Sequence, residues 1–525
     1  MPDVSGALEP PRRFNVTSWF LDRNVAEGRA DRPALVTDDG ATTYGDLAAL
    51  TNRVGNVLLS LGVRREQRVL LALGDGVAFV AAWYAVLKIG AVTAEVYTYL
   101  RPKDYRYYLD YTEAEVVIVD GTTLGPFREA IAAGSRPRHL LVVGVPEAEL
   151  LPGELSFDGL VSQAPQDLSA APTTSDDIAI WKFTTGSTGA PKACVHPASS
   201  PWHSFQRYAR GVLDLRADDL VLPVPKLFFG YARDLAALFP FGVGAAGLIF
   251  PDRATPERIF ELIARHRPTI LVNVPTMMSA MVAHPAAGAA DLSCLRMCTS
   301  AGEALPEELG RKWDNAFGVD VLDGIGSSEL YHIYLSNRPG QARAGTLGQV
   351  VPGYRARVLD DLGADAPDDE AGVLEVSGDT AALAYWGAPE KSAETFHGST
   401  VRTGDLFSHD ADGYFRYRGR ADDLLKVGGR WVAPAEIENC LLGHPDVVEC
   451  AVVGYHAEGL VLPMAFVQLR AGVDGSAERA DTLRQFVRAA LAAYKAPREV
   501  RFVTELPKTA SGKLDRRALR ELGTS

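Results

Sequence analysis

The chain has 525 residues, of which 47% are hydrophobic and 23% are charged. A single core stops growing at roughly 250–300 residues, so at least two domains are expected. The formal charge of −13 argues against a non-specific nucleic-acid or membrane-surface binder, because such proteins depend on basic patches.

The cysteines and the apolar runs indicate the compartment. Five cysteines in 525 residues do not make a disulfide framework, and Cys294 and Cys298 lack a second Cys/His pair for zinc. Residues 1–13 have no apolar core of a secretory signal. The longest uncharged apolar run, 235–250, is shorter than the roughly 20 residues that a membrane helix needs. We expect a soluble, cytoplasmic protein with reduced thiols and this run in its core.

The first two thirds of the chain alternate helical and strand-like patterns. Residues 43–61 carry apolar side chains at helical spacing, with Thr43 as a cap and Gly62 as a stop. A strand at 69–73 and a helix at 77–89 follow. Further strand-like runs lie at 116–119, 140–143, 178–183, 270–274 and 319–322. This alternation predicts layered α/β structure with largely parallel, buried strands.

The pattern changes after about Gly340. The short segments 373–377 and 414–417 are typical of antiparallel hairpins. A compact α+β pattern follows Arg420: helix 434–442, strands 447–453 and 464–469, helix 481–493 and strand 499–503. We therefore predict an α/β protein with a large N-terminal domain (1–419) of layered α/β subdomains plus a small β-rich part, and a small mobile α+β C-terminal domain (420–525).

The strongest local motif is TTGSTGAPK at 184–192, directly after the strand-like run 178–183. Hydroxyl and glycine residues let backbone and side-chain donors converge on one anion, and Lys192 adds a cation. The spacing is not that of a Walker A loop. The motif predicts a phosphate-binding loop formed by Thr184, Thr185, Gly186, Ser187, Thr188, Gly189 and Lys192.

This loop resembles the signature of the acyl-adenylate-forming superfamily, which includes acyl-CoA synthetases, adenylation domains and firefly-type luciferases. Further matches follow in the order of that family at 324–329, 403–405, 419–423 and 507–513. Each match is weak alone, but five in order span nearly the whole chain. The resemblance implies ATP-dependent activation of a carboxylic acid as acyl-AMP, with pyrophosphate release and Mg²⁺ held by Glu329.

The resemblance also implies roles for the other motif residues. Asp405 and Arg420 correspond to the residues at the ribose, and the stretch 300–304 to the adenine shelf. The catalytic set is Lys513, Glu329, Thr184 and His332. The nucleotide-binding set adds Gly302, Glu303, Ala304, Asp323, Gly324, Gly326, Ser328, Asp405 and Arg420 to the loop. Ser328 stands where Thr is commoner in the family, and the hydroxyl is preserved.

The C-terminal motifs imply a domain movement. In the family, a lysine corresponding to Lys513 bridges substrate carboxylate and α-phosphate, an interaction worth about 3–5 kcal/mol at the transition state. Asp422 corresponds to the hinge about which the C-terminal domain swings after adenylation. Gly428 and Gly429 would then line the tunnel for the thiol of coenzyme A, because they have no side chains to obstruct it.

Two segments, 226–232 and 330–337, look most like those of benzoate-CoA ligases. Phe229 stands where amino-acid-activating relatives carry an Asp, which argues against an amino-acid substrate. We expect an aromatic slot formed by Phe229, Gly230, Tyr231, Ala301, Gly326, His332 and Ile333. Gly230 leaves room for a ring substituent, and His332 is placed to hold the carboxylate or a ring hydroxyl.

Three functions stay open at this point. The first is an aryl-CoA ligase that uses ATP, Mg²⁺ and coenzyme A on a benzoate or a hydroxy- or aminobenzoate. The second loads an aryl group onto the pantetheine of a carrier protein acting in trans. The third is a catalytically silent nucleotide-binding module, against which the joint presence of Lys513, Glu329 and Asp405 argues. A luciferase-type oxygenation has no distinct residue support.

Overall fold

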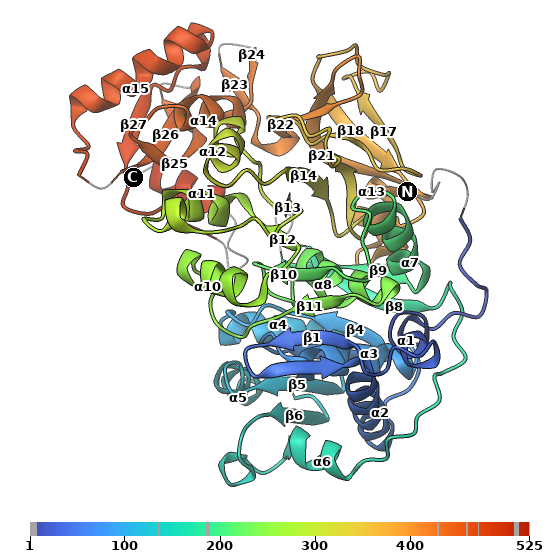
Figure 1. Cartoon of the computed structure of the whole chain (residues 1–525). Coiled ribbons are helices and arrows are strands. Elements are labelled where there is room, and N and C mark those ends of the chain that lie inside the picture. The colour runs from blue at the N-terminus through green and yellow to red at the C-terminus, as the bar shows by residue number, and fades with distance from the viewer. Residues whose placement is uncertain are drawn as a thin grey trace.

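The computed structural model describes residues 8–134, 136–184, 190–427, 430–457, 460–470, 472–508 and 514–523. Up to Arg420 the described chain is built on three sheets, and a smaller α+β unit follows, far from the strands and helix of residues 116–163 (Figure 1). Among all the residues that the structure describes, no helix is long and apolar enough to span a membrane.

The first sheet is predominantly parallel. Its strands are β3 (Arg68–Ala72), β4 (Val92–Glu95), β5 (Val116–Asp120), β6 (His139–Val143), β7 (Glu154–Ser156), β8 (Ile178–Thr184), β9 (Lys192–Pro197) and β19 (Ala384–Tyr385). They lie in the order β19-β9-β8-β4-β3-β5-β6-β7. All pairs from β7 to β8 are parallel, whereas β9 and β19 add an antiparallel edge.

Helices cover both faces of this sheet. Alternate residues of β3 point to opposite faces, so Val69 and Leu71 join one apolar cluster and Leu70 the other. The helices are α2 (Tyr44–Ser60), α3 (Val77–Lys88), α4 (Pro102–Thr112), α5 (Leu124–Ala132) and α6 (Phe157–Gln163). Helix α2 begins where predicted, because the Thr43 side chain accepts a hydrogen bond from the Asp46 amide.

The second sheet has a parallel centre and antiparallel ends. Its order is β16-β15-β14-β13-β12-β10-β11-β1-β2. The strands are β1 (Pro33–Thr37), β2 (Gly40–Thr43), β10 (Leu220–Pro223), β11 (Ala246–Leu248), β12 (Ile270–Asn273), β13 (Met297–Ser300), β14 (Val321–Gly326), β15 (Ile333–Ser336) and β16 (Gln349–Val350).

The helices associated with the second sheet are α8 (Gly230–Ala237), α9 (Phe239–Val243), α10 (Pro256–His266), α11 (Pro275–Ala283) and α12 (Glu307–Phe317). The predicted buried run 235–250 covers the end of α8, all of α9 and strand β11. Shorter helical segments are η1 (Ser18–Asp22), α1 (Arg23–Ala26), η2 (Glu147–Glu149), α7 (Ser199–Ser204), η3 (Phe205–Arg210) and η4 (Ala287–Ala289).

The third sheet is antiparallel, as the hairpin patterns predict. It contains β17 (Arg355–Leu359), β18 (Gly372–Ser377), β20 (Phe396–His397), β21 (Thr400–His409) and β22 (Phe415–Arg420), with α13 (Pro389–Thr395) beside it. Strand β22 ends where the predicted C-terminal domain begins.

The C-terminal unit has its own apolar clusters. Its elements are η5 (Ala421–Asp423), β23 (Leu425–Val427), β24 (Arg430–Val432), α14 (Pro434–Leu442), β25 (Val447–Ala457), β26 (Leu460–Leu469), α15 (Ala477–Ala490), η6 (Ala493–Lys495), β27 (Glu499–Phe502) and α16 (Arg516–Gly523).

Several predicted element boundaries are wrong: for example, β25 extends to Ala457 and not to 453, and β26 begins at Leu460 and not at 464. Helix α15 starts at Ala477 and not at 481, because the Ser476 side chain accepts a hydrogen bond from the Arg479 amide and caps the helix there. Strand β14 covers Val321–Gly326 and not 319–322, so it includes the two glycines of the predicted motif. Its antiparallel pairing with β15 requires that extension.

Candidate active site

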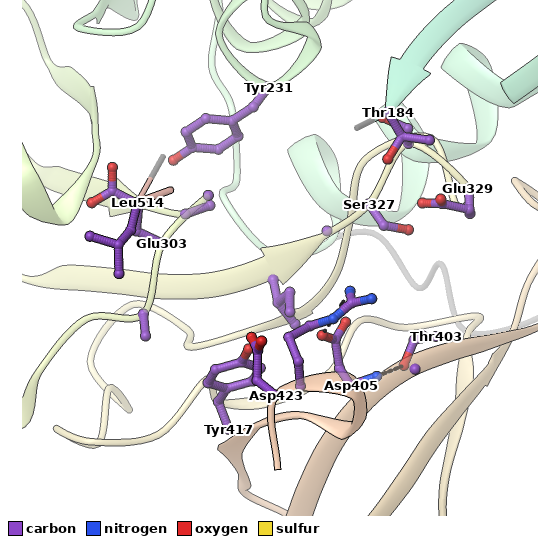
Figure 2. Close-up of a pocket in the computed structure, with 18 of the residues that line it drawn as sticks. Thr184, Tyr231, Glu303, Ser327, Glu329, Thr403, Asp405, Tyr417, Asp423 and Leu514 are labelled. Carbon is purple, nitrogen blue, oxygen red and sulfur yellow. Dashed lines mark hydrogen bonds and ion pairs between the residues drawn. The ribbon is translucent and has the colours of Figure 1, made fainter. Parts of the chain in front are cut away.

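One cavity of about 2000 Å³ brings the predicted motifs together. It lies between the two large sheets, the antiparallel sheet and the C-terminal unit, and Tyr231, Thr184, Glu329 and Asp405 all point toward it (Figure 2). Glu329, Thr184 and all described residues of the predicted nucleotide and substrate sets line it. Thr185, Gly186, Ser187, Thr188, Gly189, Gly428, Gly429 and Lys513 lie outside the described residues.

The two ends of the predicted phosphate loop are fixed by strand pairing. Thr184 ends β8 and Lys192 begins β9, and the two residues are register partners in this antiparallel pair. The loop between them therefore leaves and returns at one point beside the cavity. Both Thr184 and Lys192 line the cavity, so a hydroxyl and an ammonium flank the loop.

A histidine that sequence reasoning missed connects β9 to the segment after β14. His196, on β9, donates its Nε2 hydrogen to the Ser328 carbonyl at 2.7 Å, and the Ser328 hydroxyl donates to the Phe183 carbonyl at 3.1 Å. Burial lowers the pKa of His196 to about 3, so its imidazole is neutral at pH 7. These bonds hold the residue before Glu329 against β8.

Glu329 presents a carboxylate to the same part of the cavity. Its Oε1 accepts a hydrogen bond from the Tyr385 hydroxyl at 2.7 Å, and burial raises the pKa of that hydroxyl, which keeps it a donor. Among the described residues, no group of three His, Cys, Asp or Glu side chains could hold a metal ion by itself. One carboxylate fits Mg²⁺, which is usually bound by one or two carboxylates together with phosphate oxygens.

The predicted ribose residues form an ion pair. Asp405 on β21 and Arg420 on β22 are register partners, and Arg420 Nη1 lies 3.2 Å from Asp405 Oδ1. Both line the cavity, so the carboxylate is positioned to accept hydrogen bonds from hydroxyl groups of a ligand (Figure 2).

The predicted adenine shelf lies at the end of β13. Gly302 has a φ of +92°, a conformation that favours glycine, and a methyl group there would lie 3.7 Å from the Phe229 ring. Asp323 is buried, and its Oδ1 has no hydrogen-bond partner among the described residues. Burial raises the pKa of Asp323, and an unpartnered buried oxygen suits an amino group of a ligand. Glu303 instead accepts hydrogen bonds from Thr276 at 2.6 and 3.1 Å.

The aromatic slot is formed next to the adenine shelf. The Phe229 and Tyr231 rings are 6.1 Å apart, and the Tyr231 and His332 rings are 5.8 Å apart. Gly326 is required here, because a methyl group at that position would lie 2.4 Å from the His332 carbonyl oxygen. Ala301 and Ile333 add further apolar lining. The slot is therefore lined mainly by aromatic and apolar side chains and is continuous with the nucleotide side of the cavity.

His332 presents an acceptor and not a cation. Its Nε2 lies 3.4 Å from the Tyr231 carbonyl oxygen, which can only accept, so Nε2 carries the hydrogen. Burial lowers the pKa of His332 to about 3, which leaves the ring neutral. Its Nδ1 is buried with no partner among the described residues. Such an atom can accept a hydrogen bond from a ring hydroxyl, whereas a carboxylate would have to share the Nε2 hydrogen.

Four charged side chains at the floor of the cavity were not predicted. Lys182 pairs with Asp234 at 2.6 Å, and Arg233 pairs with Glu95 and with Asp234, each at 2.8 Å. Two features of the sequence could have predicted these ion pairs: a lysine inside the apolar strand 178–183 and an Arg-Asp pair before the apolar run 235–250. Charges inside apolar segments indicate buried ion pairs, because buried charges have to be paired. The space beside Gly230 is accordingly not empty: a methyl group there would lie 2.8 Å from Lys182 Nζ.

Comparison with known families identifies the class to which this fold and cavity belong. The model of the AMP-binding enzyme family matches residues 21–386, and that of the AMP-binding enzyme C-terminal domain matches residues 436–513. The chain belongs to the AMP-binding enzyme family, which confirms the predicted superfamily and its α/β fold.

Individual relatives narrow the comparison. The chain is 42% identical to a benzoate–CoA ligase of Thauera aromatica over 98% of this chain and 97% of the relative. It is 39% identical to a 4-hydroxybenzoate–CoA/benzoate–CoA ligase of Rhodopseudomonas palustris, over 98% and 95% of the two chains. The crystal structure of a benzoate CoA ligase from Burkholderia xenovorans matches with a TM-score of 0.89 and 38% identity, over 97% of this chain and all of that one.

Proposed function

We propose that this protein is an AMP-forming aryl-CoA ligase. It activates benzoate or a substituted benzoate with ATP, releases pyrophosphate, and transfers the acyl group to the thiol of coenzyme A. The observation that carries the proposal is the convergence on one cavity of an aromatic slot and the polar residues expected at a nucleotide. The relatives at 42% and 39% identity, both named as CoA ligases of aromatic acids, support it.

The nucleotide side of the cavity is assigned by motif and geometry together. Asp405 accepts hydrogen bonds from the ribose, with Arg420 paired beside it. Asp323 and the shelf around Gly302 receive the adenine. The loop from Thr184 to Lys192 and the Ser328 segment receive the phosphates. Further members of this set are Thr185, Gly186, Ser187, Thr188, Gly189, Glu303, Ala304, Gly324 and Gly326.

Activation joins two anions, so the chain's own residues serve mainly to position and neutralise. Glu329 is the ligand for Mg²⁺, and Tyr385 fixes the orientation of its carboxylate. Bound Mg²⁺ supplies positive charge at the phosphate oxygens. Lys192 adds a cation at the loop. The apolar walls of the slot exclude water from the acid, which strengthens these interactions.

The C-terminal unit supplies the remaining groups. We assign residues 1–419 to an adenylation domain and 420–525 to a mobile domain, and the two separate family matches support this division. Lys513 bridges the acid and the α-phosphate during adenylation. Rotation about Asp422 then exchanges it for Gly428 and Gly429, which line the path of the thiol.

Coenzyme A is the acceptor that we favour over a carrier protein. The relatives reported above are CoA ligases by name, and nothing in the comparisons supports a carrier partner. The cysteines Cys194, Cys294, Cys298, Cys440 and Cys450 are free thiols, which suits a reducing compartment, and we place the enzyme in the cytoplasm. We expect no nucleic-acid or membrane partner.

A substrate screen tests the proposal. Pyrophosphate release is measured with ATP, Mg²⁺ and a panel of benzoates, cinnamates and short fatty acids, with and without coenzyme A. Benzoates are expected to give the highest kcat/KM and an aryl-CoA product that mass spectrometry detects. Highest activity with fatty acids would contradict the aromatic slot, and an adenylate that transfers only to a carrier pantetheine would contradict the assigned acceptor.

A further inference from the structure

A buried lysine lies at the floor of the aromatic slot. Lys182, on β8, is 7% exposed and lines the cavity, and its ammonium lies beside Gly230. It donates hydrogen bonds to Asp234 Oδ2 and to the Tyr331 carbonyl, both at 2.6 Å. An ammonium has three donors, and no described oxygen accepts the third. The ammonium also lies 3.6 Å from the centre of the Tyr331 ring, so a ligand oxygen in the slot would compete for the third hydrogen with an aromatic face and not with a described oxygen.

The lysine belongs to a balanced set of buried charges. Asp234 also accepts from Arg233, and Arg233 pairs with Glu95, which accepts further hydrogen bonds from Trp83 and Thr93. Two cations thus face two anions. A second carboxylate on the ligand would leave an unbalanced buried charge, which is costly, whereas a neutral acceptor would not.

The charge state of Lys182 restricts which ring substituent can accept its hydrogen bond. Burial lowers the pKa of Lys182 to about 8, against the opposing effect of Asp234, so the group is mostly a cationic donor at pH 7. A ring hydroxyl can accept from such a donor. An aromatic amino group is a poor hydrogen-bond acceptor, because its lone pair is delocalised into the ring. Unsubstituted benzoate has no acceptor on its ring.

We propose that Lys182 is a specificity residue that selects hydroxybenzoates over benzoate and aminobenzoates by donating a hydrogen bond to the ring hydroxyl. This inference rests on the proposed function and names its substrate class. Asp234 is a positioning residue, since it holds the ammonium at the slot. The strained backbone of Tyr331, whose φ is +69°, places the second acceptor of Lys182 directly before His332.

The test compares substrate ratios. For the wild type, kcat/KM for pyrophosphate release is measured with benzoate, the three hydroxybenzoates and the three aminobenzoates. One hydroxybenzoate is expected to exceed both benzoate and the corresponding aminobenzoate at least about tenfold, the effect of one unsatisfied buried donor. Lys182→Met should reduce that ratio at least about fivefold.

The matched control is Lys88→Met. Lys88 is 3% exposed and pairs with Asp22 at 2.8 Å, but it does not line the cavity, so its loss should leave the substrate ratio unchanged. A folded Lys182→Met variant with the wild-type ratio would overturn the inference. If this variant does not fold, the wild-type ranking decides, and a preference for benzoate or an aminobenzoate overturns it. If no aromatic acid causes pyrophosphate release, that result would instead refute the proposed function itself.

Discussion

The buried histidine that connects β9 to the Ser328 carbonyl allows a quantitative prediction about acid stability. The pKa of His196 is about 3 in the folded protein, against about 6.5 for an unfolded imidazole. The unfolded state therefore binds the proton first as the pH falls. The contribution of His196 to stability is complete above about pH 6.5 and is lost as the pH falls toward about 3.

The magnitude follows from the unfolded-state titration. At pH 5.5 protonation stabilises the unfolded state by about 1.4 kcal/mol, and at pH 7.5 by about 0.1 kcal/mol. The variant His196→Gln keeps a donor at the position of Nε2 for the Ser328 carbonyl but cannot titrate. When the pH is lowered from 7.5 to 5.5, the free energy of unfolding should therefore fall by about 1.4 kcal/mol less in the variant than in the wild type.

Urea unfolding at pH 7.5 and 5.5, followed by tryptophan fluorescence, measures this difference. The comparison at pH 7.5 shows separately what the substitution costs in packing. Equal losses between the two pH values in wild type and variant would refute the assignment of His196 as a buried neutral group. A smaller acid loss in the variant, with adenylation kept at pH 7.5, would support it.

Four further predictions concern the reaction. Tyr385→Phe should raise the Mg²⁺ concentration for half-maximal pyrophosphate release about fivefold, since it removes the donor that orients Glu329; an unchanged Mg²⁺ titration contradicts this. Lys513→Ala should lower adenylation about 100-fold or more while supplied aryl-AMP still reacts with coenzyme A; equal loss in both half-reactions refutes the role. Asp422→Pro should block only the thioester step, and normal rates in both steps would mean a misplaced hinge. Gly326→Ala should raise KM for the acid about tenfold and raise KM for ATP less, and a larger effect on ATP than on the acid would move Gly326 out of the slot.

The fold was predictable where local signals agree with packing. Helix α14 lies at its predicted bounds, because apolar periodicity and Pro434 at its first position mark them. Strands β3, β5, β6 and β8 of the first sheet could be recognised because both faces of the sheet are buried, which makes most of each strand an apolar run. Strands β4, β7, β9 and β19 were not predicted, because they are short or carry polar residues. The order and pairing of the strands depend on contacts between distant segments, and the sequence pattern carried no signal for them.

The site was predictable where glycine and hydroxyl residues gather in motifs. Gly326 and Gly302 stand where a close backbone approach or a positive φ requires glycine, so the motif itself carries the geometry. Tyr385 was missed, because it reaches Glu329 from 56 residues further along the chain. Lys182 and Asp234 were missed for the same reason, although charges inside apolar runs were a visible signal of buried pairing.

The central claim is that the separate motifs form one site at which an aromatic acid receives AMP. Acid-dependent exchange of labelled pyrophosphate into ATP measures that step directly, without coenzyme A. We expect exchange that requires Mg²⁺ and a benzoate and that falls sharply in Glu329→Gln. Exchange that no aromatic acid stimulates, or that survives unchanged in this variant, would contradict it.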